Sequence, residues 1–151
     1  MPEIIISDTS VLIILSNINE LDLLQKVYGK IITTAVIAKK FNEPLPQWIE
    51  IRDIVNPESQ KILETQIDKG EASAIALALE TPHSLILLDD YKGRKMAQNL
   101  GLKFTGTIGV IIKAKLSGII TSIKPIILKI RQTNFRLSED IEKQALLAAG
   151  E

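Results

Sequence analysis

Two adjacent carboxylates follow a short apolar run in SLILLDDYKGR, residues 84–94. Asp89 and Asp90 come directly after five residues that suit a buried β-strand. Paired acids at the end of a buried strand repel each other and are costly to remove from water. We therefore expect a cation, or other compensating groups, beside them.

Two more acids occupy comparable positions. Asp8 follows the apolar run EIIIS at 3–7, and Glu71 begins the alanine-rich segment EASAIALALE after Gly70. Each acid also has an ordinary explanation, since Asp8 or Asp90 could cap a helix and Glu71 could complement a helix dipole. Helix capping and dipole effects explain each acid separately, but they explain less well why several acids occur at the ends of predicted strands and the start of a predicted helix.

The residue types determine what chemistry a joint site could perform. Carboxylates gathered without histidine or cysteine form an oxygen-only site, which suits hard cations such as Mg²⁺ or Mn²⁺. Such ions polarise phosphoryl oxygens and activate water in phosphodiester cleavage. The chain has no cysteine, and its one histidine, His83, lies in a turn segment with nothing to orient it.

Short apolar runs alternate with helical patterns along the whole chain, which predicts a parallel sheet covered by helices on both faces. In such sheets the functional crevice lies beyond the carboxyl ends of the strands. We expect strands at 3–7, 30–34, 49–55, 84–88 and 102–105, and helices at 9–18, 20–28, 35–41, 58–67, 71–80, 91–101, 107–118, 122–132 and 138–149.

Charge is unevenly distributed although the net charge is zero. Residues 1–90 contain 7 basic and 14 acidic residues, whereas residues 91–138 contain 10 basic residues and no acid. This asymmetry favours a polyanionic or acidic partner, although separate solvated helix faces would give the same count. We expect one domain over residues 1–151. The absence of cysteine, of a leader and of a long apolar run favours a soluble cytoplasmic protein without a membrane span.

Four motifs in order resemble the PIN-domain superfamily, and in particular its branch of small prokaryotic nucleic-acid-binding proteins. They are SDTSVLI (7–13), GEASAIALA (70–78), LLDDYKGRKMAQNLGL (87–102) and GTIGVIIKAKLSGII (106–120). The resemblance implies an α/β/α sandwich and a Mg²⁺- or Mn²⁺-dependent ribonuclease acting on RNA. It also implies the toxin half of a toxin–antitoxin pair, with an antitoxin protein as partner and a homodimeric assembly.

The resemblance also implies roles for individual residues. Asp8, Glu71 and Asp89 match the metal-binding catalytic acids, and Asp90 is a neighbour that would join them. Thr9, Ser10 and Thr107 match polar positions near the site, and Arg94 matches an arginine that fixes the Asp89–Asp90 turn or contacts phosphate. The basic residues Lys92, Arg94 and Lys95 would guide the nucleic acid backbone toward the acids.

One position departs from the family pattern. Relatives place an acid on the helix after the second strand, where this chain reads ITTAVIAKKFNE and has Lys40. Three readings follow: Lys40 points to solvent, Glu43 substitutes as a ligand from one turn further on, or the Lys40 ammonium takes the place of the metal. The third reading would leave a catalytically silent module that binds nucleic acid or protein.

Two other interpretations belong to different classes of protein. A phospho-acceptor signalling domain also gathers aspartates at strand ends, but its acidic pair follows the first strand rather than a late one. The apolar segment 118–130 is interpreted either as a cover for one sheet face or as a surface for a dimer partner.

Overall fold

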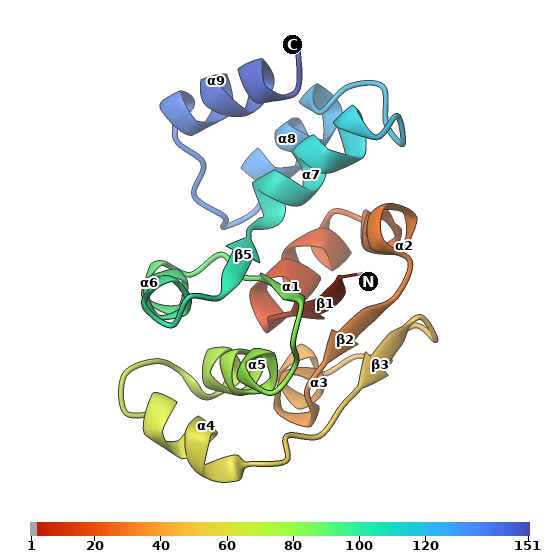
Figure 1. The fold of residues 1–151 in the computed structure, drawn as a ribbon. Helices are drawn as coiled ribbons and strands as arrows, with labels where there is room; N and C mark the ends of the chain where they lie inside the picture. The colour runs from red at the N-terminus through yellow and green to blue at the C-terminus, as the bar shows by residue number, and fades with distance from the viewer. Residues whose placement is uncertain (1–2) are drawn as a thin grey trace.

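The computed structural model describes residues 3–151, in which five parallel strands form the centre of the molecule (Figure 1). The strand order is β3-β2-β1-β4-β5, and all four neighbouring pairs run parallel. The strands are β1 (Ile4–Ser7), β2 (Ile31–Thr33), β3 (Ile49–Ile51), β4 (Ser84–Leu87) and β5 (Lys103–Thr105).

Helices cover both faces of the sheet, as the alternation of patterns predicts. Helix α5 lies against β1 and β4 with α4 and α6 beside it, and α1, α2 and α7 pack together as the second helical layer. Within residues 3–151 no helix is long and apolar enough to cross a membrane. The helices are α1 (Thr9–Asn17), α2 (Asp22–Tyr28), α3 (Ala35–Phe41), α4 (Pro57–Leu63), α5 (Lys69–Leu79), α6 (Tyr91–Asn99), α7 (Thr107–Leu116), α8 (Lys124–Arg131) and α9 (Glu139–Ala148).

The expected α/β class and three-layer α/β/α arrangement are confirmed. The central strands are buried on both faces, which is why their sequences are continuous apolar runs rather than alternating ones. Ile6 and Ile86 are fully buried in adjacent strands, and Ile75 of α5 is fully buried above them. One continuous apolar core results, and the strand ends are held rigidly by it.

The strand order reverses between β1 and β4. Connections from β1 lead toward β2 and β3, whereas those from β4 lead toward β5, so the chain leaves the two strands in opposite directions. A parallel sheet opens a crevice at such a point. β1 and β4 are paired over their full length, and the Asp8 amide donates to the Leu87 carbonyl at 2.9 Å. The acids that follow these strands therefore emerge side by side.

Several expected boundaries are wrong, and the largest differences are at α4, α5 and β3. Helix α4 ends at Leu63 and not at residue 67. Helix α5 begins at Lys69, so Gly70 lies in its first turn instead of breaking the chain before it. The Asp68 carboxylate caps this helix by accepting from the Glu71 amide. Strand β3 ends at Ile51 and not at residue 55: the Arg52 amide still donates to Thr33, but the amides of Val55 and Asn56 donate to the Glu80 carboxylate.

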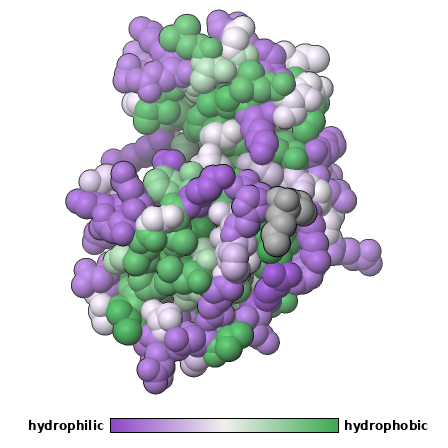
Figure 2. All heavy atoms as spheres, viewed as in Figure 1, coloured by the Kyte–Doolittle hydropathy of each residue, from purple (hydrophilic) through white to green (hydrophobic). Residues whose placement is uncertain are grey.

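The apolar C-terminal segment is mostly used within the protein. Ile126, Ile127 and Ile130 of α8 are buried, so this helix acts as a cover. Apolar side chains nevertheless remain visible over the end of the molecule that α7, α8 and α9 form (Figure 2). The large exposed apolar residues of these three helices are Leu116, Leu128, Ile141 and Leu147.

A buried hydroxyl pair joins α3 to α5 and provides a test of this packing. Thr34 caps α3 by accepting from the Ile37 amide, and its hydroxyl lies 2.7 Å from that of Ser73. Thr34→Val keeps the shape but removes both bonds, so we expect a loss of about 1–2 kcal/mol in the free energy of unfolding. Urea denaturation measures it. The control Thr121→Val, at an exposed position, should change stability by less than about 0.5 kcal/mol.

Candidate active site

A cavity of about 300 Å³ opens where β1, α5 and α6 meet, at the point of strand reversal. Seven of its eight lining residues are polar or charged, and four of these are acidic. Asp8 follows β1, Glu71 lies in the first turn of α5 and Asp90 precedes α6. The lining residues are Asp8, Thr9, Ser10, Ile13, Lys40, Asp68, Glu71 and Asp90.

Glu71 is the most perturbed acid in this cavity. It is 6% exposed, and its Oε1 atom is buried without a hydrogen-bond partner among the described residues. Burial, together with a hydrogen bond shared with the adjacent Asp90 carboxyl, raises the pKa of Glu71 to about 8. A buried carboxyl of this kind lacks a positive partner, so the first turn of α5 does not account fully for this residue.

Asp8 has a similar environment. It is 4% exposed, and although it occupies the position before α1, its side chain makes no capping bond. Burial raises the pKa of Asp8 to about 6, while the Thr9 amide and, to a smaller extent, the Lys40 ammonium oppose this increase. The Ser10 hydroxyl donates to Asp8 at the long distance of 3.5 Å. The Asp8 carboxylate is therefore available to a ligand.

Asp89 and Asp90 face different cavities. Asp90 lies on the acidic cavity and caps α6, since one carboxylate oxygen accepts from the Gly93 amide. Asp89 instead accepts from Thr107 at the start of α7, at 2.7 Å from the backbone amide and 2.6 Å from the hydroxyl. The structure thus brings Asp8, Glu71 and Asp90 together and directs Asp89 toward α7.

Lys40 lies at the rim of the acidic cavity. Its ammonium binds Asp68 at 2.9 Å, and both side chains are about half exposed. Gly70 permits this approach, because a Cβ there would lie 3.3 Å from the Lys40 side chain. Glu43 does not line the cavity: α3 ends at Phe41, and Glu43 follows the left-handed Asn42 on the exposed surface.

Asp68 is the site residue that the sequence interpretation missed. Its signal was present in the DKGE segment, where an acid stands three residues before Glu71 at the start of a helix, a typical capping pattern. The misplaced start of α5, after Gly70, concealed it. Asp68 adds a fourth acid at the rim and holds Lys40 there.

The other predicted residues are distributed around the site. Thr9 lines the cavity, and its buried hydroxyl has no partner among residues 3–151. Lys92 and Lys95 are exposed on α6 and make no ion pair in the described part of the chain. The Arg94 guanidinium lies over the Phe104 ring, 5.0 Å from its centroid, on the side of Asp89.

The basic block is partly neutralised by acids that lie outside it in the sequence. Lys103 pairs with Glu3, and Lys129 pairs with Glu20. Two further pairs within the C-terminal part join Lys115 to Glu151 and Arg131 to Glu142. Four of the ten basic residues of the block are therefore paired with an acid within the described residues.

The donor set fits a hard divalent cation by chemistry, although it is not a complete cage. Asp8, Glu71 and Asp90 offer only oxygen atoms, and the unbonded Glu71 oxygen lacks the positive partner that an ion supplies. Over residues 3–151, no three acid, histidine or cysteine side chains are already close enough to enclose an ion. Mg²⁺ commonly uses one or two carboxylates and completes its shell with water and substrate phosphate.

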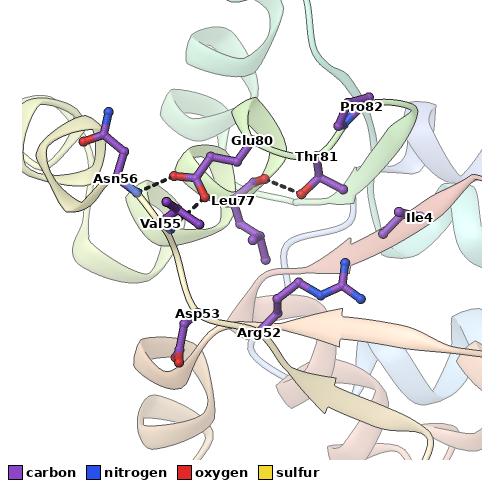
Figure 3. A pocket seen from close by; sticks show the side chains of 9 residues that line it. All are labelled: Ile4, Arg52, Asp53, Val55, Asn56, Leu77, Glu80, Thr81 and Pro82. Carbon is purple, nitrogen blue, oxygen red and sulfur yellow. Dashed lines mark hydrogen bonds between the residues drawn. The ribbon is translucent and has the colours of Figure 1, made fainter.

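A larger cavity lies elsewhere and has a different character (Figure 3). It occupies about 650 Å³ between the end of β3 and the end of α5. Two of its three charged residues are already bonded: Glu80 accepts from the amides of Val55 and Asn56, and Arg52 binds Glu50, while the third, Asp53, is exposed. The smaller acidic cavity, with its unbonded carboxylate, is therefore the better candidate for chemistry.

The raised pKa values predict how stability changes with pH in metal-free protein. The pKa values of Asp8 and Glu71 lie near 6 and 8 when folded and near 4 when unfolded, so the folded state holds more protons between pH 4 and 8. The free energy of unfolding should therefore fall as pH rises through this range. Glu71→Gln should flatten this fall, measured by urea denaturation in EDTA at pH 5, 6.5 and 8. Glu58→Gln, at an exposed first-turn position of α4, should leave the profile unchanged; an equal effect of both would contradict the assignment.

The sequence was compared with curated proteins and with models of protein families. A search of curated proteins returned no match. The model of the family described as "PIN domain" matches residues 4–151, which is nearly the whole chain and includes every residue of the acidic cavity. PIN domains have a nuclease-type fold and generally use divalent metal ions. The chain belongs to the PIN-domain family.

Proposed function

We propose that this protein is a Mg²⁺- or Mn²⁺-dependent endoribonuclease. The observation that carries the proposal is the cavity at the strand reversal, where Asp8, Glu71 and Asp90 meet and a buried Glu71 oxygen has no partner. Membership of a family with a nuclease-type fold agrees with it. Perturbed carboxyl groups in a cleft are also typical of functional sites.

Asp8, Glu71 and Asp90 would hold the cation. Asp89, which the family resemblance places among the metal ligands, accepts from Thr107 with both oxygens, so we assign it as a positioning residue instead. A bound ion supplies an activated water and polarises a phosphoryl oxygen. Burial of Asp8 and Glu71 excludes water that would otherwise screen their charge. Ser10 orients Asp8, and the unbonded Thr9 hydroxyl is available to a water or ligand.

The substrate class follows from the groups beside the acids. Lys92 lines a cavity beside the acidic one, and Glu71 and Asp90 line both, so Lys92 lies at the edge of the proposed site. Lys95 follows on the same exposed helix. Cations of this kind bind phosphates, which gives salt-dependent affinity with little sequence preference. RNA is the substrate we assign, on the family likeness.

The biological setting is part of the same proposal. We assign the protein as the cytoplasmic toxin of a toxin–antitoxin pair, with an antitoxin protein as partner and a homodimer as its assembly, because the sequence resembles that branch of the family. The exposed apolar residues of α7, α8 and α9 support an interaction surface there.

A catalytically silent binding module is the second candidate. It is favoured by Lys40, which stands where relatives carry an acid and whose ammonium already lies on the acidic cavity. Against it, the Lys40–Asp68 pair is half exposed, and exposed pairs contribute only about 0–1 kcal/mol. Lys40 can therefore leave the cavity at small cost when a divalent ion enters.

Loss of the Asp8 carboxylate tests the chemistry. Asp8→Asn keeps the shape but removes a charge from the proposed ligand set, so RNA cleavage with Mn²⁺ should fall at least about 100-fold. A labelled single-stranded RNA resolved on a gel measures the rate. The control Asp22→Asn, an exposed acid outside the cavity, should retain full activity. Unchanged cleavage by Asp8→Asn would refute the proposal.

Mn²⁺ titration calorimetry separates the two candidates. We expect the unmodified protein to bind Mn²⁺, and Lys40→Glu to bind it about tenfold more tightly because an acid replaces the ammonium at the rim. Lys39→Glu, the exposed neighbouring position, should leave affinity unchanged. Binding by Lys40→Glu alone, with no heat from the unmodified protein, would favour the silent module.

A further inference from the structure

A second cavity lies on the other side of the Asp89–Asp90 pair. It has a volume of about 370 Å³, within the range of small-molecule sites. Residues from α6, from the β5–α7 junction and from the segment 132–138 between α8 and α9 line it. Because Asp90 faces the acidic cavity and Asp89 faces this one, the two cavities flank a single dipeptide.

The polar part of this second cavity is positively charged. Arg94 and Arg136 both line it, and neither makes an ion pair within the described residues 3–151. The Arg94 Nε atom is buried without a hydrogen-bond partner in that range. Asp89 is the one acid among the described lining residues, and both of its oxygens are bonded to Thr107. The two guanidinium groups therefore remain available to an anion.

The remaining wall is apolar. Phe135, Ile108 and Leu137 are half-buried and line the same cavity as the arginines. A simple anion needs only the guanidinium groups, whereas an aromatic ring beside them suits a planar base. A charged end and an apolar wall in one cavity of this size match a nucleotide.

We propose that this cavity binds one nucleotide of the RNA adjacent to the cleavage position. Its phosphate contacts Arg94 and Arg136, and its base lies against Phe135. The inference rests on the proposed function, because it assumes that the acidic cavity receives the scissile phosphate. Consecutive residues are about 3.8 Å apart at Cα, so one strand can pass over Asp89 and Asp90 and enter both cavities.

Binding without cleavage provides the test. A fluorescent single-stranded RNA of eight nucleotides is titrated with the unmodified protein and its variants in EDTA, over a range of salt concentrations. Arg136→Gln should weaken binding at least about fivefold and reduce the slope of log affinity against log salt by about 1. Arg131→Gln is the matched control, since this exposed arginine lies outside the cavity and pairs with Glu142. Equal binding by the two variants would overturn the proposal.

A ring-specific variant tests the base contact. Phe135→Leu retains an apolar side chain but removes the aromatic ring, so it should weaken binding of the normal RNA and leave binding of an abasic strand unchanged. Equal weakening for both strands would overturn the base assignment. Urea denaturation confirms that each variant is folded.

Competitors distinguish the source of the phosphate. Adenosine monophosphate should displace the RNA at millimolar concentration, as expected for one nucleotide unit. Tight binding of the free nucleotide together with no RNA binding would make this a mononucleotide site and overturn the RNA assignment. If a polyglutamate peptide binds more tightly than the RNA, the arginines bind an acidic protein segment, and the RNA assignment is overturned as well.

Cleavage assays separate this inference from the proposed function. If RNA binding depends on Arg136 but no variant cleaves RNA with Mn²⁺, the proposed function fails and the nucleotide site stands. If the unmodified protein cleaves RNA and Arg136→Gln has the same kcat and KM, the nucleotide site fails and the proposed function stands.

Discussion

The pairing of β1 with β4 is the constraint on which the functional site depends. These two strands are 80 residues apart in sequence, yet Ile4 pairs with Ser84 and Ser7 pairs with Leu87. Both strands are buried in the apolar core, and their four paired residues place the two strand ends level with each other. Asp8 and the Asp89–Asp90 pair consequently emerge at one edge, and α5 adds Glu71 to the same place. The acids are held together by packing, against their own repulsion.

This arrangement explains why the site retains groups that reduce stability. Asp8 and Glu71 are both buried, and their raised pKa values reflect the cost of ionising them there. Lys40, which lies at the rim of the cavity in a half-exposed ion pair with Asp68, offsets part of the negative charge of these acids. A fold optimised only for stability would replace the two buried acids with apolar residues. Their presence fits the cation site that we propose.

Most of the architecture could be predicted from the sequence, because buried parallel strands and alanine-rich helices have strong local signatures. Asp8 and Glu71 could be singled out from the sequence, because Asp8 directly follows a predicted strand and Glu71 begins a predicted helix. The directions of the Asp89 and Asp90 side chains could not be predicted from the sequence. Adjacent residues in a loop are oriented by their hydrogen-bond partners, which here are Thr107 and Gly93. Phe135 and Arg136 lie on an irregular segment, and nothing in their local sequence connects them to Arg94, 42 positions earlier. Such long-range proximity depends on how α7, α8 and α9 pack.

The Asp89–Asp90 dipeptide anchors two helices at once, since Asp89 holds the first turn of α7 and Asp90 holds that of α6. Selection for foldability alone would retain both aspartates, even in a descendant that had lost catalysis. Their occurrence in a related chain is accordingly a poor indicator of enzymatic competence. Glu71 and Asp8 are more informative, because the side chain of Asp8 makes no cap bond and one Glu71 oxygen has no bonding partner in residues 3–151. Substitution of those two residues in a related chain would therefore be the earliest sign that the activity had been lost.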